Sequence, residues 1–156
     1  MKNLLSIFIL VVMATTSISA QQVEKRKMQF NVEKSGLAIE GYDPVAYFTS
    51  NKAMEGKQEI STVYNGITYR FASVQNRDAF KANPAKYEPQ YGGWCAYAMG
   101  AKGEKVEVDP GTFKIVNDKL YLFYNKYFTN TLKSWNKDEA HLKTNADKSW
   151  EKFIQQ

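Results

Sequence analysis

The stretch that most restricts the fold is STVYNGITYRFAS, residues 61–73. Two runs of β-branched and aromatic residues flank Asn65-Gly66, the dipeptide that is most favoured in a tight two-residue hairpin turn. The stretch TFKIVNDKLYLFYN, residues 112–125, has a similar arrangement around Asn117-Asp118. The sequence therefore predicts two antiparallel β-hairpins.

Signals for helices accompany these hairpins. Asp43 can cap, and Pro44 suits, the start of a short helix, while Ser73 can cap a helix that stops before Pro84. Another helix is predicted from Gly93 to Met99. The C-terminal segment carries an apolar stripe at helical spacing: Leu142, Ala146, Trp150 and Phe153. Short antiparallel hairpins packed with helices predict a small single domain of the α+β class.

The first twenty residues, MKNLLSIFILVVMATTSISA, have the three parts of a secretory signal: a positive start, an apolar run and small residues before the cleavage point. We therefore expect a signal peptide over 1–20, a polar lead-in over 21–34 that is extended or mobile, and the folded domain over 35–156. The apolar run is short for a membrane span, so a retained anchor is the less favoured alternative and no stable span is expected after cleavage. The expected location is the periplasm or the outside of the cell.

The charge pattern bears on the class of partner. The sequence has 21 Lys and Arg against 16 Asp and Glu, a formal net charge of +5. Loss of Lys2 with the signal lowers this charge by one. The lysines are interspersed with acids, as in KSWNKDEAHLK over 133–143, which is typical of a solvated surface rather than a nucleic-acid-binding stripe. Nucleic acid is not an expected partner.

The only cysteine, Cys95, lies in YGGWCAYAMG, residues 91–100. A single cysteine forms no internal disulfide, so the domain is expected to be held together without one. In the predicted helix Cys95 falls in the first turn, where free N–H groups and the helix dipole favour a thiolate. This makes Cys95 the candidate nucleophile. Because free cysteine is also one of the most buried residue types, a structural thiol is the other interpretation.

Residues near Cys95 are candidates for the lining of a pocket. They supply aromatic rings on neighbouring faces of the predicted helix, or glycines that allow close backbone approach: Tyr91, Gly92, Gly93, Trp94 and Tyr97. Asn76 is added because it lies four residues before Phe80, on the inward side of its predicted helix. A buried amide there needs hydrogen-bond partners, so Asn76 is either a satisfied structural group or a polar part of the pocket.

Two other polar residues have simpler interpretations. His141 is the only histidine and lies off the apolar stripe, so it is predicted to be exposed, which weakens a Cys–His nucleophile. Asp43 could be an acid or a metal ligand, but capping of the short helix explains it more simply.

Four segments, taken in order, together resemble the YHS-domain family: GYDPVAYF (41–48), YNGITYRFAS (64–73), NRDAFKANPAKY (76–87) and YGGWCA (91–96). The resemblance covers about residues 41–150. It is closest to the exported, stand-alone branch, described as YHS domain-containing (seleno)protein. Some members of that branch carry selenocysteine, at a position that we take to be that of Cys95. The resemblance thus implies redox or nucleophilic chemistry for this position.

Metal-associated members of the family carry cysteines after an Asp-Pro-Val and in a Phe-Cys-Ser-x-x-Cys pattern. This chain has Ala46, Ala72 and Asn76 in those places. Copper and zinc sites of this kind need several thiolate or imidazole ligands. The metal function of these relatives is therefore not carried over, and no residue is assigned as a metal ligand.

Three functional hypotheses follow. The first is an exported binding or sensor module that takes a small ligand or a protein partner near Cys95. The second is a thiol-dependent redox protein that uses Cys95 with an external reductant, because the chain has no resolving cysteine. The third and weakest is a copper- or zinc-binding protein that uses Cys95 with His141 or carboxylates. The sequence identifies no cofactor and leaves open whether the protein is an enzyme.

Overall fold

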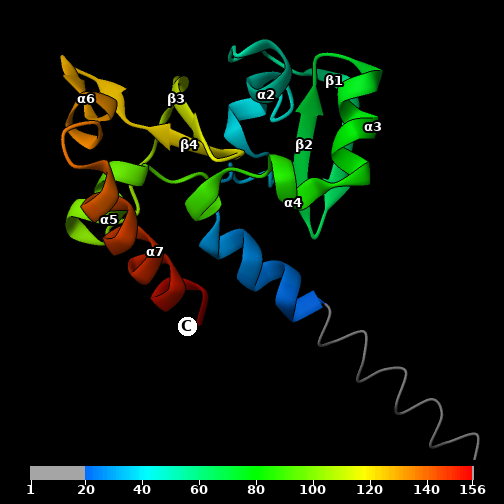
Figure 1. The fold of residues 1–156 in the computed structure, drawn as a ribbon. Helices are drawn as coiled ribbons and strands as arrows, with labels where there is room; N and C mark the ends of the chain where they lie inside the picture. The colour runs from blue at the N-terminus through cyan, green and yellow to red at the C-terminus, as the bar shows by residue number, and fades with distance from the viewer. Residues whose placement is uncertain (1–19, 156) are drawn as a thin grey trace, which may run out of the picture.

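Both predicted hairpins are present in the computed structural model, which describes residues 20–155 (Figure 1). The first pairs β1 (Lys57–Tyr64) with β2 (Ile67–Phe71), and the second pairs β3 (Asp109–Val116) with β4 (Lys119–Phe123). A third hairpin, which the sequence analysis did not predict, pairs β5 (Asn125–Lys126) with β6 (Thr129–Asn130). All three pairings are antiparallel, and each described hairpin forms its own two-stranded sheet.

Helices pack around these hairpins and connect them. A helix over 20–29 comes first. The later helical elements are η1 (Ile39–Gly41), α2 (Ala46–Ser50), α3 (Val74–Ala82), α4 (Pro84–Tyr87), η2 (Gln90–Gly93), α5 (Ala96–Lys102), α6 (Thr131–Trp135) and α7 (Glu139–Gln155). In Figure 1, α2, α3 and α4 lie beside the first hairpin, and α5, α6 and α7 lie beside the second.

The helix signals in the sequence are largely confirmed. The Ser73 hydroxyl accepts a hydrogen bond from the Asn76 N–H and so caps α3, which ends one residue before Asn83. On α7, the predicted apolar stripe faces the core, with Leu142 and Ala146 buried.

The lead-in over 21–34 was expected to be extended or mobile, but residues 20–29 form a helix. This segment is rich in good helix formers such as Gln, Glu, Lys and Met. It also packs on the rest of the chain. Arg26 forms an ion pair with Glu88 and lies over the Phe30 ring, and a Cβ added at Gly66 would meet Val23 at 2.2 Å. Tertiary packing therefore stabilises a helix in a segment whose polarity indicated none.

The predicted helix start at Gly93 was also wrong, since α5 begins at Ala96 and Cys95 is its N-cap. Tyr91 and Gly92 have φ values of 56° and 60°, and these left-handed conformations interrupt any regular α-helix. Residues 90–93 form a 3-10 turn instead, and Cys95 follows it in a non-helical conformation.

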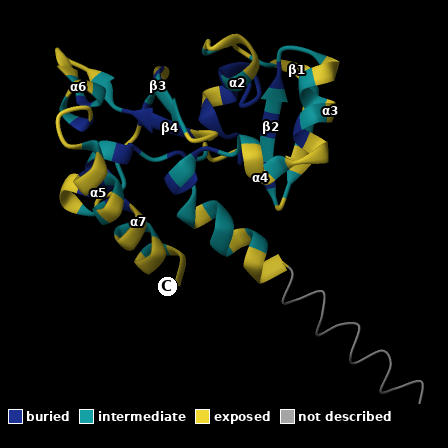
Figure 2. Ribbon diagram, in the orientation of Figure 1, coloured by how far each residue is buried: buried dark blue, intermediate teal, exposed yellow. Residues whose placement is uncertain are grey.

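Strand β4 joins two hydrophobic clusters. Leu120 and Leu122 on one face belong to the cluster that contains the first hairpin. Tyr121 and Phe123 on the other face pack in a second cluster with Trp135 of α6. All four strand residues are almost fully buried (Figure 2). The strand thus sends alternate side chains into different clusters, and each such burial contributes about 1.5–3 kcal/mol.

The whole is a small single domain of the α+β class, as predicted: short antiparallel hairpins packed with helices. Within residues 20–155, no helix has both the length and the apolar character needed to cross a bilayer. The predicted signal peptide falls almost entirely outside the described residues.

Candidate functional site

The sulfur of Cys95 lies fully buried at the start of α5. The backbone fixes this residue from both sides, because its N–H donates to the Val106 carbonyl at 2.9 Å and its carbonyl accepts from the Met99 N–H at 3.0 Å. The Tyr124 N–H lies 3.3 Å from Sγ, and the Thr131 hydroxyl lies 3.4 Å from it. Cys95 is therefore anchored between α5, β4 and α6.

These contacts close a small hydrogen-bond network. The Thr131 hydroxyl donates its one hydrogen to the Tyr124 carbonyl at 2.9 Å, which leaves its oxygen free to accept from the Cys95 S–H. The Tyr124 N–H in turn donates to the sulfur. Donors and acceptors are matched in this network without a solvent molecule or another ligand. The arrangement is that of a packed structural thiol.

Tyr91 and Gly92 serve to join distant parts of the chain. The Tyr91 hydroxyl donates to Asp147 of α7 at 2.9 Å, and burial together with this hydrogen bond raises the pKa of Tyr91 well above its ordinary value. At Gly92, an added Cβ would lie 2.7 Å from the Trp150 ring and 3.1 Å from Phe30. A side chain at Gly92 would therefore separate α7 from the N-terminal segment.

Three further candidates, Trp94, Tyr97 and Gly93, also have structural roles. The Trp94 indole N–H donates to the Gln29 carbonyl at 2.7 Å and ties the helix over 20–29 to the domain. Tyr97 is half-buried and packs against both hydrophobic clusters. Gly93 is buried, with φ at 86°, and its carbonyl accepts from the Asn31 amide at 3.2 Å. The candidate residues around Cys95 are neighbours in the sequence, but the structure directs each of them to a different partner.

Asn76 belongs to a second buried centre, built around Asp43. One oxygen of the Asp43 carboxylate accepts from the N–H groups of Val45 and Ala46, at 2.8 and 3.2 Å. The other accepts from the Ala72 N–H at 2.8 Å and from the Asn76 side-chain amide at 2.7 Å. Asp43 is fully buried. Asp43 is therefore the partner that the Asn76 amide requires. The predicted helix start was placed too early, because α2 begins at Ala46 with Val45 as its N-cap, and Asp43 instead holds the turn that leads into the helix.

The three residues that the sequence analysis compared with the cysteines of metal-associated YHS domains surround one carboxylate in the structure. Ala46, Ala72 and Asn76 each donate a hydrogen bond to Asp43. Converging N–H donors stabilise negative charge, which is the opposite of what a cation site offers. Within residues 20–155, no group of three or more His, Cys, Asp and Glu side chains has the arrangement of a metal site.

His141 is exposed, as predicted. Its ring nitrogens lie 3.2 Å from Asp138 and 3.3 Å from Asn145, both on the surface of α7 or just before it. The sulfur of Cys95 has Tyr124 and Thr131 as its partners instead. The geometry gives no support to a Cys–His pair.

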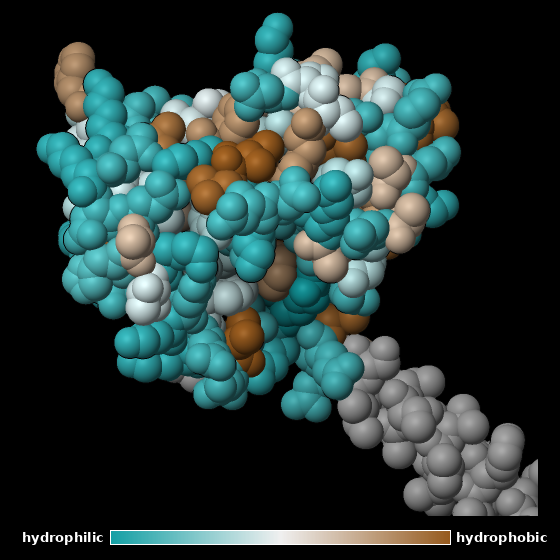
Figure 3. Space-filling model, in the orientation of Figure 1, coloured by the Kyte–Doolittle hydropathy of each residue, from teal (hydrophilic) through white to brown (hydrophobic). Residues whose placement is uncertain are grey.

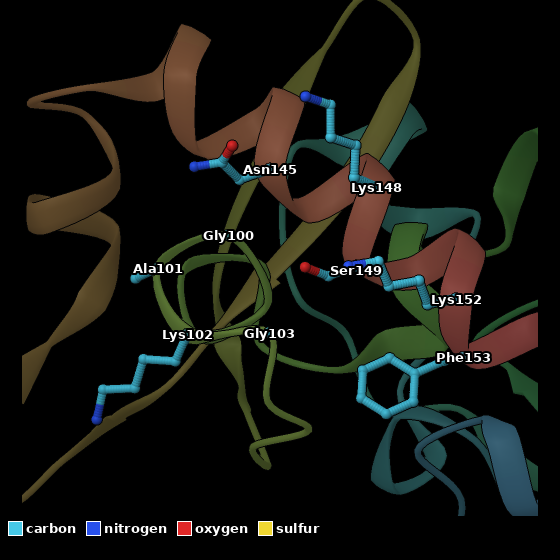
Figure 4. A pocket seen from close by; sticks show the side chains of 9 residues that line it. All are labelled: Gly100, Ala101, Lys102, Gly103, Asn145, Lys148, Ser149, Lys152 and Phe153. Atoms are coloured by element: carbon cyan, nitrogen blue, oxygen red, sulfur yellow. The ribbon is translucent and has the colours of Figure 1, made fainter.

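A groove of about 500 Å³ lies between the end of α5 and one face of α7 (Figure 4). Gly100 allows the two helices to approach, because a Cβ there would lie 2.3 Å from the Leu142 carbonyl oxygen. The lining residues are Gly100, Ala101, Lys102, Gly103, Asn145, Lys148, Ser149, Lys152 and Phe153. None of the candidate residues from the sequence analysis lines this groove.

Three lysines and no acidic residue line the groove. Figure 4 shows Ser149 directed toward the end of α5, with Lys102 and Lys148 extending from opposite parts of the rim. Lys105 lies nearby, 4.9 Å from the Phe153 ring centroid, and loss of solvent lowers its pKa. The sequence analysis missed this groove because scattered lysines indicated only a solvated surface. The spacing of Asn145, Ser149 and Phe153, at i, i+4 and i+8 on one helix, was the available signal.

No family model, curated protein or solved structure matches this chain.

Proposed function

We propose that this protein is an exported binding module of the YHS type, and that its ligand site is the groove between α5 and α7. The observation that carries the proposal is the lining of this groove, which combines three lysines with an amide, a hydroxyl and an aromatic ring. Its volume of about 500 Å³ is that of a pocket for a small organic ligand. The lysines favour an anionic ligand, such as a carboxylate or a sulfonate.

Each wall of the groove has a separate task in this proposal. Lys148 and Lys152 supply positive charge one turn apart on α7, and Lys102 supplies it from α5. Asn145 and Ser149 offer neutral hydrogen-bonding groups, and Phe153 offers an apolar face at one end. A ligand with an anionic group and an aromatic or aliphatic body satisfies these groups together.

Cys95 contributes to this function as a structural residue. It caps α5, whose other end forms one wall of the groove. Its sulfur is fully buried, and the hydrogen-bond network around it is complete. The thiol-dependent redox hypothesis needs this network to open before any reaction, so the structure favours the binding hypothesis.

The test is titration with 8-anilinonaphthalene-1-sulfonate, an anionic aromatic probe, followed by its fluorescence. We expect saturable binding at one site that weakens as salt is added. The double variant Lys148→Gln/Lys152→Gln should bind about tenfold more weakly. Lys81→Gln/Lys86→Gln is the matched control, because it removes the same charge from exposed positions on α3 and α4.

Equal losses in the groove and control variants would show that the probe responds only to net charge, and would overturn the groove as the site. Non-saturable binding would do the same. Export has its own test, which is the N-terminal sequence of the protein recovered outside the cytoplasm. We expect it to begin at Gln21, and an intact N-terminus in the cytoplasm would contradict export.

A further inference from the structure

The third hairpin has a turn whose residues do not suit its backbone. In the first two hairpins, the two turn residues are Asn65-Gly66 and Asn117-Asp118, and all four have positive φ. Asn, Asp and Gly tolerate this conformation well. The two residues of the β5–β6 turn also have positive φ, 52° and 65°, but they are Tyr127 and Phe128. Bulky residues pay about 1–2 kcal/mol each in this conformation.

These two residues, here called the aromatic tip, are also the most exposed of the large hydrophobic side chains described. Tyr127 is 87% exposed and Phe128 is 112% exposed. An apolar side chain projects at the corner of Figure 3 that corresponds to this hairpin in Figure 1. Strain combined with full exposure brings no benefit to the isolated fold, which points to a role in binding.

The base of this hairpin is held firmly. The Asn125 amide donates to Thr112 at 2.9 Å and to Asp109 at 3.3 Å. Asn130 caps α6 by accepting from the Leu132 N–H at 3.1 Å. Side-chain hydrogen bonds therefore tie both strands of the hairpin to the rest of the domain.

The stretch of chain that carries the aromatic tip is positively charged. Between residues 119 and 137 there are four lysines and no acidic residue. All four are exposed: Lys119, Lys126, Lys133 and Lys137. Nearby acids lie outside this stretch, and two of them already have partners. Asp109 accepts from Asn125, and Glu139 pairs with Lys114 at 2.5 Å. Asp118 and Asp138 border the stretch at its two ends and are exposed.

We propose that the aromatic tip inserts into the interface of an anionic lipid bilayer, while exposed lysines of the same stretch contact its phosphate headgroups. Aromatic side chains favour the region between headgroups and acyl chains. A lysine near an anionic surface contributes about 1 kcal/mol. The inference is independent of the α5–α7 groove.

A lipid surface suits the tip better than a protein partner does. Two aromatic side chains bury about 150–250 Å² each, and a stable protein interface needs about 800 Å² from each partner. A hairpin tip alone supplies too little area for such an interface. Insertion into lipid needs only the tip and the exposed lysines of the same stretch.

The test is sedimentation of the full-length protein with vesicles, either of phosphatidylcholine alone or with phosphatidylglycerol added. We expect binding that requires the anionic lipid and falls with salt. In the variant Tyr127→Asn/Phe128→Gly, the turn gains the favoured Asn-Gly sequence, so its urea midpoint should equal or exceed that of the wild type. Its partitioning to anionic vesicles should fall at least about tenfold.

The matched control is Val63→Ser/Val74→Ser, which removes two exposed apolar side chains elsewhere. It should leave partitioning unchanged. Any affinity due to residues 1–20 is common to all three proteins, so the difference reports the tip. Equal partitioning of the tip variant and the wild type overturns the inference. Absence of vesicle binding also overturns the inference, and a protein partner would then be the remaining occupant of the tip.

Discussion

Asp43 and Cys95 are two fully buried polar centres among residues 20–155, and they are built differently. At the first, the Asp43 carboxylate accepts four hydrogen bonds that come from its own turn, from the residue after β2 and from α3. At the second, the Cys95 sulfur meets one N–H donor and one hydroxyl, at 3.3 and 3.4 Å. Neither side chain has measurable exposure to solvent.

The difference follows from what each group loses on burial. A carboxylate gives up strong hydration and requires several donors in return, whereas a thiol behaves as a small apolar group with a weak donor. Asp43 therefore organises the segments around it, and Cys95 fills space between elements that other contacts already place. The sequence analysis placed the chemistry at Cys95, but the stronger polar interactions are at Asp43.

The largest expected effect is that of Asp43→Ala. This change leaves two buried and two half-buried donors without their acceptor, so the free energy of unfolding should fall by about 4 kcal/mol. Urea denaturation measures the loss. Ser73→Ala removes a single cap from α3 and should cost about 1 kcal/mol. If both variants lose the same amount, Asp43 is no more than an ordinary helix cap.

A second expectation concerns access to the thiol. Native Cys95 should react with iodoacetamide at least about 100-fold more slowly than in the urea-unfolded chain, because reaction requires local opening. The control is Val63→Cys, which places a thiol at an exposed strand position and should label rapidly. Labelling of native Cys95 at the unfolded rate would restore the redox hypothesis.

Removal of the sulfur itself should cost less than removal of the carboxylate. Cys95→Ala leaves a small cavity and one N–H without its weak acceptor, so we expect a loss of about 1.5 kcal/mol. Thermal or urea unfolding measures it. Cys95→Ser keeps an acceptor at the same place and tests whether the hydrogen bond or the volume matters. A loss as large as that of Asp43→Ala would make the two centres equivalent.

The parts of the fold that were predictable are those with local signals. Asn65-Gly66 and Asn117-Asp118 identified their hairpins, because few other residues suit such turns. The Tyr127-Phe128 turn was missed for the same reason, since aromatic residues carry no turn signal. The helix over 20–29 was missed because it depends on packing against residues such as Gly66 and Glu88, which are distant in the chain.

The candidate site shows a similar limit. Asn76 was predicted as an amide in need of partners, and it has one, whereas Asp43 was predicted as a helix cap and instead holds the turn before α2. Their sequence separation of 33 residues concealed that each is the other's partner. The groove between α5 and α7 depends on a close helix crossing at Gly100, which no local pattern marks.

The smallest expected effect tests the hydrogen bond between Asn76 and Asp43 directly. Asn76→Ala removes one of the four donors to Asp43, so it should cost only about 1 kcal/mol in urea denaturation. In the variant that also carries Asp43→Ala, the same change should cost almost nothing, because the hydrogen bond is already lost. The double-mutant cycle should therefore give a coupling of about 1 kcal/mol. Fully additive losses would mean that Asn76 stabilises α3 through other contacts, and that Asp43 depends on backbone donors alone.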